Sequence, residues 1–164
     1  MRILGFDPGI TGAIAVIGGG RAMVYDMPIA KLKKGKNAVM AAELWKLCAS
    51  LHFDAVYCEQ VSAIPGQGVS STFSFGRSLG VIEGVAASFG KPFHLVTPQR
   101  WKKHFGLIGT DKDAARTIAS QLFPEAELSR KKDIGRADAL LIARYGWEQA
   151  QAMYLGKASE REAV

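Results

Sequence analysis

The chain has 164 residues, 48% of them apolar and 22% charged, which fits one folded domain with a core of ordinary size. Lysine and arginine number 21 against 15 acidic residues, and this formal charge of +6 favours nucleic acid as a partner. Cys48 and Cys58 form no CxxC motif, which argues against a disulfide scaffold and a zinc cluster and favours a cytoplasmic protein. Asp7 and Pro8 interrupt the first apolar run, and no uncharged run reaches 18 residues, so we expect no export signal and no membrane partner.

Three short strands are predicted at the start of the chain, at residues 2–7, 13–17 and 22–27. Turn residues separate them, Pro8-Gly9 after the first strand and Gly18-Gly19-Gly20 after the second. These short connections predict that the strands are adjacent and antiparallel. The next segment, residues 28–36, is rich in lysine and is expected to be a loop.

The middle of the chain predicts a helix, a strand and a second helix. Asn37 is expected to cap a helix that extends to Leu51, and a buried strand follows at residues 54–59. After a loop at residues 61–68, a long helix is predicted over residues 69–89. Its glycines are spaced four apart, which predicts close approach of another helix, either as a buried helix or as a dimer contact; they are Gly76, Gly80 and Gly84.

The last third predicts a strand at residues 92–96, a basic helix or turn at 98–105 and a helix that Thr110 caps and Pro124 ends. A final helix is expected to begin near Asp133 and to pass Tyr154. The resulting order βββαβαβαα indicates an α/β fold in which antiparallel strands come first. We expect one domain over residues 1–155 and a loose tail over residues 156–164.

Three acidic residues occupy positions that are unusual for surface charges. Asp7 ends the first strand, Glu59 ends the fourth, and Asp138 lies between Ala and Leu residues in the last helix. Each has an ordinary alternative: Asp7 capping its turn, Glu59 pairing with a lysine, and Asp138 pairing with a nearby Arg or Lys. Together they suggest a cluster that a divalent cation holds, because buried carboxylates otherwise repel one another.

Ligands that are all carboxylate oxygens suit Mg²⁺ or Mn²⁺. A pair of such ions can activate water and stabilise the leaving oxygen at a phosphodiester. A basic surface around an acidic metal centre is the charge pattern of a nuclease.

Three motifs in series resemble the RuvC family of Holliday-junction resolvases, especially its phage-type members. They are Phe6-Asp7-Pro8-Gly9-Ile10-Thr11-Gly12, Glu59-Gln60-Val61 and Ala137-Asp138-Ala139-Leu140. The resemblance implies an RNase H-like fold with a mixed five-stranded sheet, three leading antiparallel strands and flanking helices. It also implies a homodimer, in the cytosol of a bacterium or phage-infected host, that resolves four-way DNA junctions by paired nicks on opposed strands.

The same resemblance implies that Asp7, Glu59 and Asp138 are catalytic metal ligands for Mg²⁺ or Mn²⁺, with two ions per active site and no small-molecule cofactor. The family's fourth ligand usually lies three residues before the last aspartate, where this chain has Gly135. Asp133 is the nearest substitute and is assigned as a catalytic metal ligand, with an N-cap of the last helix as its alternative.

A second departure from the family concerns an aromatic wedge three residues after the strand-end glutamate. Ser62 occupies that place. Phe73 or Phe75 could take over stacking on an opened base, although aromatic residues in an apolar helix are more typical of a core.

The basic residues between residues 91 and 136 include candidate DNA contacts, each with solvated surface as its alternative. Those assigned to DNA binding are Arg100, Lys102, Lys103, Lys112, Lys131 and Lys132. Two other functions remain open. One is a branched-DNA-binding protein with a degenerate metal centre, and the other is a related RNase H-like nuclease that acts on RNA.

Overall fold

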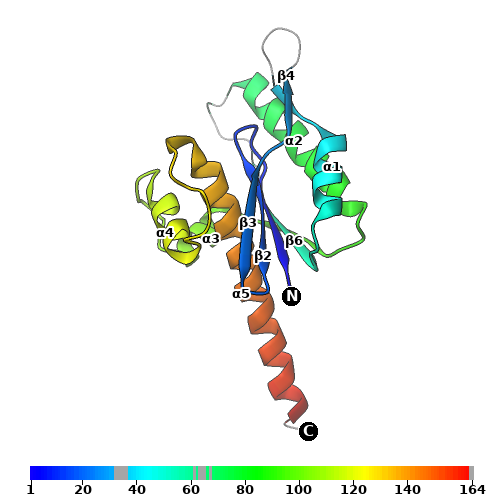
Figure 1. Ribbon diagram of the computed structural model, residues 1–164, viewed down its shortest axis with the longest axis vertical. Helices are drawn as coiled ribbons and strands as arrows, with labels where there is room; N and C mark the ends of the chain where they lie inside the picture. The colour runs from blue at the N-terminus through cyan, green and yellow to red at the C-terminus, as the bar shows by residue number, and fades with distance from the viewer. Residues whose placement is uncertain (32–36, 61, 63–65, 67, 163–164) are drawn as a thin grey trace.

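The structure of the protein, a computed structural model, describes residues 1–31, 37–60, 62, 66 and 68–162. Figure 1 shows a central sheet with helices on both of its faces. The sheet has the strand order β3-β2-β1-β6-β7. Its strands are β1 (Ile3–Asp7), β2 (Ala13–Gly18), β3 (Arg21–Asp26), β6 (Ala55–Glu59) and β7 (Phe93–Val96). The first three are antiparallel, and β6 and β7 continue the sheet in parallel, which confirms the predicted mixed five-stranded sheet.

A two-stranded sheet lies where the sequence predicted a loop and a helix cap. It pairs β4 (Ile29–Lys31) with β5 (Asn37–Val39), while residues 32–36 lie outside the described part of the chain. The first helix, α1 (Ala41–Ser50), begins after Met40, so Asn37 is not its cap. Val39 is buried beside the α1 side of the main sheet, and this burial as a strand residue outweighs the weak helical periodicity of the segment.

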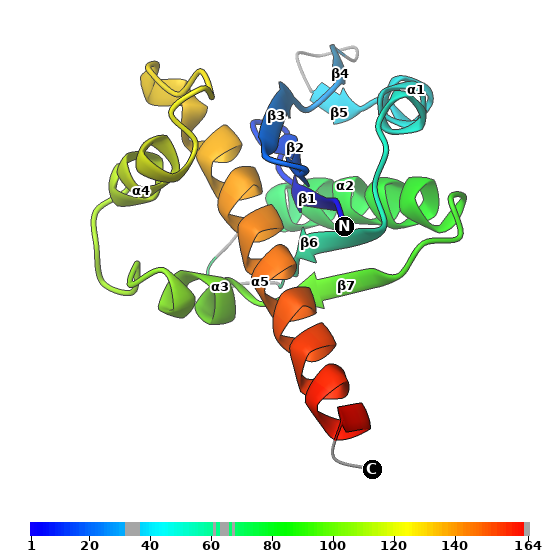
Figure 2. The same cartoon turned by 60° about the horizontal axis from the view of Figure 1, so that its bottom comes forward.

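The remaining helices are α2 (Val69–Ala87), α3 (Pro98–His104), α4 (Ala114–Leu122), the short 3-10 helix η2 (Lys131–Asp133) and α5 (Ile134–Glu162). Thr110 does not cap α4: the N-cap is Asp113, and Asp111 Oδ1 accepts hydrogen bonds from the backbone N–H groups of Asp113 and Ala114. The α5 helix extends past the sheet to Glu162, where we had expected a loose tail (Figure 2). No helix in the described residues is long and apolar enough to cross a membrane.

The core has two parts, one on each face of the sheet. The α1 and α2 side buries Leu4 and Phe6 of β1, and the α3, α4 and α5 side buries Ile3 of the same strand. This alternation is the two-residue period of a strand buried on both faces.

Glycine is required where α5 crosses β1. A Cβ atom on Gly5 would lie 2.5 Å from the carbonyl oxygen of Ala139 and 2.7 Å from the backbone nitrogen of Ala143. The helix backbone therefore rests directly on the strand that ends in Asp7, which fixes the distance between α5 and the sheet edge.

Candidate active site

The first two carboxylates lie at the same edge of the sheet. β1 and β6 are parallel neighbours, and their register pairs Phe6 with Cys58. Asp7 and Glu59 are the next residues of these two strands, so both side chains belong to the carboxyl edge of adjacent parallel strands. That edge is where α/β sheets usually bind ligands.

The α5 helix brings the third carboxylate to this edge. Gly135 packs against the turn that follows β1: a Cβ atom there would lie 3.0 Å from Asp7 Oδ2 and would collide with the carbonyl oxygen of Thr11. Asp138 follows one helical turn later and therefore lies on the same side of α5. It is half-buried, as is Glu59.

The electrostatics show that the three carboxylates act on one another. Burial, followed by the charges of Asp138 and Glu59, raises the pKa of Asp7 from 3.8 to about 7. Burial also raises the pKa of Asp138 to about 7; the charge of Lys102 opposes this shift and that of Glu59 adds to it. The pKa of Glu59 lies above its ordinary value, chiefly because of burial. The sequence prediction that these carboxylates converge therefore agrees with the structure.

Two consecutive residues of α3 complete the site. Trp101 is fully buried, and its indole N–H donates a hydrogen bond to Glu59 Oε2 at 2.7 Å. The charge of Lys102 lowers the pKa of each of the three carboxyl groups. Sequence reasoning had placed Lys102 among the DNA contacts and had overlooked Trp101. The signal available was a tryptophan in an otherwise basic segment, which favours a buried anchor.

The donor set fits divalent cations. Three carboxyl groups in a half-buried cluster repel one another, and Lys102 supplies one positive charge. Oxygen-only ligands are those that Mg²⁺ and Mn²⁺ prefer. Within the described residues, no three acidic, histidine or cysteine side chains are grouped closely enough to hold an ion as they stand. The assignment of a divalent-cation site therefore rests on the carboxylate oxygens of the cluster and on its excess negative charge.

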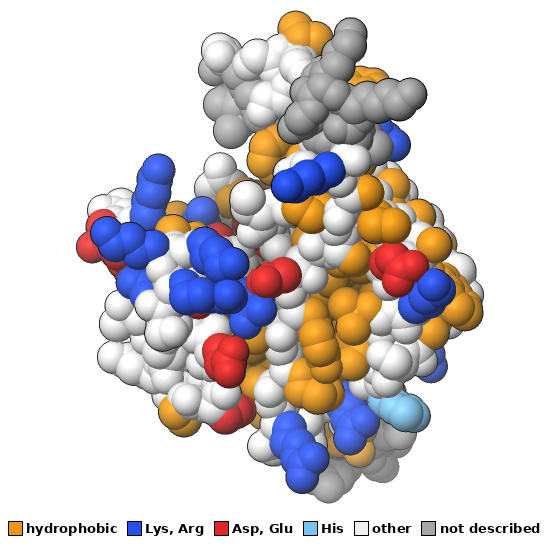
Figure 3. All heavy atoms as spheres, turned by 45° about the horizontal axis from the view of Figure 1, so that its top comes forward, with side chains coloured by type: hydrophobic (Ala, Val, Ile, Leu, Met, Phe, Trp, Pro, Cys, Tyr) orange, Lys and Arg blue, Asp and Glu red, His pale blue; other side chains and the backbone are white. Residues whose placement is uncertain are grey.

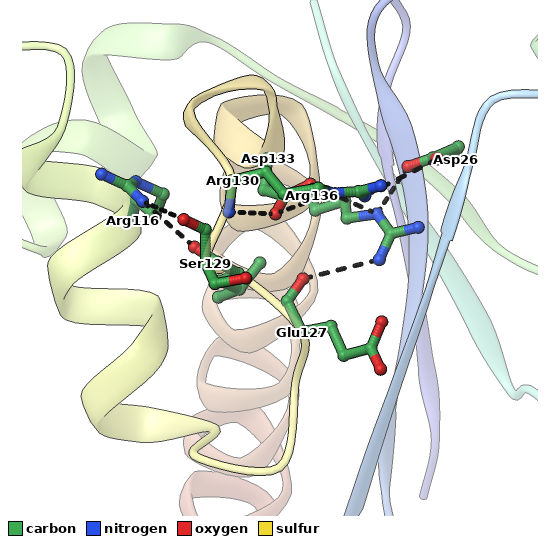
Figure 4. Close-up of polar contacts among 8 residues, drawn as sticks. Asp26, Arg116, Glu127, Ser129, Arg130, Asp133 and Arg136 are labelled. Carbon is green, nitrogen blue, oxygen red and sulfur yellow. Dashed lines mark hydrogen bonds and ion pairs between the residues drawn. The ribbon is translucent and has the colours of Figure 1, made fainter.

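Asp133 has other partners (Figure 4). Its side chain is 1% exposed, and its Oδ1 and Oδ2 accept hydrogen bonds from the Arg130 side chain and backbone N–H at 2.7–3.2 Å. Burial alone would raise the pKa of Asp133, but the bonds and charge of Arg130 lower it below its ordinary value. Arg136 joins the same network and reaches Asp26 of β3. These contacts make Asp133 the third residue of a capping box at the start of η2 instead of the N-cap of α5, and its role as a metal ligand stays an untested prediction.

The resemblance implies a fourth ligand at position 135, but the turn after β1 leaves no room for a side chain there. A substitution at Gly135 tests this close contact. Gly135→Ala would force α5 away from the turn after β1, so we expect a loss of about 1–3 kcal/mol in the free energy of unfolding, measured by chemical denaturation. Ser120→Ala is the control: Ser120 is exposed on α4, so alanine there should not lower the stability. Equal stability of Gly135→Ala and wild type would contradict the close contact.

The predicted DNA contacts lie mainly on one side of this edge. Figure 3 shows Lys and Arg side chains gathered on the side of α4 and the start of α5. Arg100, Lys103, Lys112, Lys131 and Lys132 are all exposed, and Lys102 is half-buried beside the carboxylates. Lys112 lies in the turn before α4.

The α2 helix presents its glycines outward. Gly76, Gly80 and Gly84, here called the glycine face, are exposed, and a Cβ atom at any of them would meet no other atom within 4 Å. The opposite side of α2 packs on the sheet through Ile82. Phe73 is 72% exposed and Phe75 is 38% exposed, so the alternative that they are core residues does not hold.

The strand order, the two strand-end carboxylates and the crossing helix that carries a third define an RNase H-like fold with a candidate nuclease centre. Comparison with solved structures agrees with this fold. Thermus thermophilus RuvC in complex with a Holliday junction substrate superposes with a TM-score of 0.62, at 19% identity over 87% of this chain and 90% of that one. The yeast mitochondrial Holliday junction resolvase Ydc2 superposes with a TM-score of 0.55, at 14% identity over 86% of this chain and 76% of that one.

Proteins of similar sequence indicate the class of protein more closely than the fold does. The chloroplastic Holliday junction resolvase MOC1 of Chlamydomonas reinhardtii is 36% identical over 116 residues, 66% of this chain and 13% of that protein. The crossover junction endodeoxyribonuclease RuvC of Corynebacterium efficiens is 28% identical over 151 residues, 87% of this chain and 67% of that protein. No family model matches the sequence. These relatives support a RuvC-family resolvase, and the chain spans only a small part of the MOC1 protein.

Proposed function

We propose that this protein is a structure-selective endonuclease that resolves four-way DNA junctions by nicking two opposed strands. The observation that carries the proposal is the half-buried carboxylate cluster of Asp7, Glu59 and Asp138 beside an exposed basic surface. The exposed lysines and arginines attract the phosphate backbone of DNA and bring it close to the carboxylate cluster. The names of the MOC1 and RuvC relatives support the same activity.

Asp7, Glu59 and Asp138 would hold Mg²⁺ or Mn²⁺, and we propose two ions per site. Such ions supply activation of the attacking water and stabilisation of the leaving oxygen. Lys102 would bind the scissile phosphate, because its charge already acts on all three carboxyl groups. The exposed lysines and arginines would position the flanking backbone without reading sequence.

A junction assay tests the proposal. A labelled four-way junction is incubated with the protein in Mg²⁺ or Mn²⁺, beside a linear duplex of the same sequence and an RNA–DNA hybrid. Paired symmetric nicks on the junction alone support it. Binding without cutting would favour the alternative of a branched-DNA-binding protein with a degenerate metal centre. One observation favours that alternative: among the described residues, no three possible ligands are grouped closely enough to hold an ion. Preferential cleavage of RNA would overturn it in favour of a ribonuclease.

We further propose that two copies of the chain pair through the glycine face of α2. The face is exposed, lacks side chains that would hold a partner helix away, and continues into the exposed Val69 and Phe73. A two-fold dimer would put one cluster on each of two symmetry-related strands, which paired nicking requires.

Gly80→Lys is expected to convert the dimer to a monomer, measured by sedimentation velocity, because lysine fills the space that a partner helix would occupy. The fold should tolerate it, since no atom lies near that Cβ position. Ser120→Lys adds the same charge to an exposed position of α4 and should leave the dimer intact. A wild-type protein that sediments as a monomer at all concentrations would contradict pairing.

A further inference from the structure

Trp101 is the largest fully buried side chain of the described residues, yet its polar edge points into the carboxylate cluster. The ring packs in the core part shared with α4 and α5, and its Nε1–H donates to Glu59 Oε2 at 2.7 Å. A buried indole N–H needs a partner, and the half-buried carboxylate of Glu59 at the end of β6 supplies it. A carboxylate away from water is costly unless it is hydrogen-bonded and paired with a positive charge.

The ring holds its donor in one place. An indole has two side-chain torsions, and close packing restricts both. The carboxylate that accepts from it is therefore held as well, with Oε2 occupied by the N–H and Oε1 left for other contacts. Lys102 follows Trp101 in the same short helix, so the packing of the ring also places the cation of the site.

We propose that Trp101 is a positioning residue that orients Glu59 through Oε2, leaves Oε1 as the oxygen that binds a divalent ion, and thereby sets the affinity of the centre for that ion. This inference rests on the metal centre of the proposed function. Hydrogen bonds from such supporting residues orient metal ligands, and their loss typically costs about 10–100-fold in metal affinity or activity.

Trp101→Phe tests the inference, because phenylalanine keeps an aromatic ring in the core and removes the donor. Isothermal titration of the protein with Mn²⁺ should show affinity reduced by about 10–100-fold. Cleavage should need correspondingly more Mn²⁺, while the affinity for a four-way junction in EDTA stays unchanged. Trp147→Phe is the matched control, because Trp147 contacts Arg144 and lies apart from the carboxylates. Identical Mn²⁺ isotherms for Trp101→Phe and wild type would overturn the inference.

A second measurement needs no folded Trp101 variant. The chain has three tryptophans, so the indole N–H signals of the wild-type protein can be assigned by elimination with Trp45→Phe and Trp147→Phe. The Trp101 signal should be protected from solvent exchange and should shift in a saturable way with Mg²⁺, while the other two stay in place. A Trp101 signal that does not respond, in a protein that binds Mg²⁺, would reject the role.

These readouts separate the inference from the proposed function. Ion titrations do not depend on cleavage. If Trp101→Phe weakens Mn²⁺ binding but the wild-type protein cuts no junction, only the proposed nuclease activity is refuted. A protein that cuts junctions with equal Mn²⁺ dependence in wild type and Trp101→Phe would refute only the role of Trp101.

Discussion

Asp7→Asn is expected to slow junction cleavage by about 10³-fold or more, a loss of about 4 kcal/mol in transition-state stabilisation. Asp7 is the most strongly coupled member of the cluster, since the charges of both Asp138 and Glu59 act on it. An amide of the same shape carries no negative charge and is a poor ligand for Mg²⁺. Single-turnover cleavage of a labelled four-way junction in Mg²⁺ or Mn²⁺ measures the effect.

Junction binding in EDTA should survive this substitution, because it removes a negative charge from a face that meets phosphates. The backbone N–H of Gly9, which donates to Asp7 Oδ1 at 3.4 Å, can still donate to the amide oxygen. Glu43→Gln neutralises an exposed acid of α1 and serves as the control, with unchanged cleavage expected. Cleavage by Asp7→Asn at the wild-type rate would remove Asp7 from the metal centre.

The stability of the protein in EDTA is expected to fall as the pH rises from about 4 to about 7. Asp7 and Asp138 have pKa values near 7 in the folded protein against 3.8 as the ordinary value. Between these values the folded state binds more protons than the unfolded state, so the free energy of unfolding decreases with pH and the loss is complete above about 7. At about 1.4 kcal/mol per pKa unit, one such carboxyl costs on the order of 4 kcal/mol, a drop of roughly 10 °C in Tm.

Thermal unfolding at several pH values in EDTA measures this decline, and two comparisons identify its source. Asp7→Asn should flatten the decline and be more stable than wild type at pH 8.5, because it removes a buried charge from a repelling cluster. Mg²⁺ or Mn²⁺ should restore the wild-type Tm at high pH, since an ion that binds the folded state alone stabilises it. A Tm that is independent of pH in this range would show that the carboxylates do not repel one another.

The sheet and the three principal carboxylates could be predicted because their signals are local. The run from Ile3 to Asp7 shows its strand character and its end within a few residues, and short turns leave antiparallel pairing as the simplest connection. Glu59 and Asp138 stand out because an acid in an apolar setting conflicts with burial. The three motifs in series then pointed to the RuvC family, which the relatives support.

The strand pair that was missed has a non-local origin. The pairing of Ile29 with Val39 joins segments on either side of a lysine-rich stretch, so neither half carries a strong strand pattern alone. The start of α4 differs for a local reason, because the helix begins after Asp113 and Asp111 accepts hydrogen bonds from the N–H groups there. Arg130 binds the carboxylate of Asp133, which spacing alone does not show, and the role of Asp133 as a metal ligand stays an untested prediction.

The amino-acid sequence alone determined which residues of this protein carry charge, where strands end and which acids conflict with apolar neighbours, because these are properties of residue type and short spacing. Only the tertiary structure decided that Trp101 reaches Glu59 across 42 positions and that Gly135 touches the turn bearing Asp7. Both contacts depend on where whole helices settle on the sheet. That placement minimises the energy of the packed core as a whole, and no local pattern encodes it.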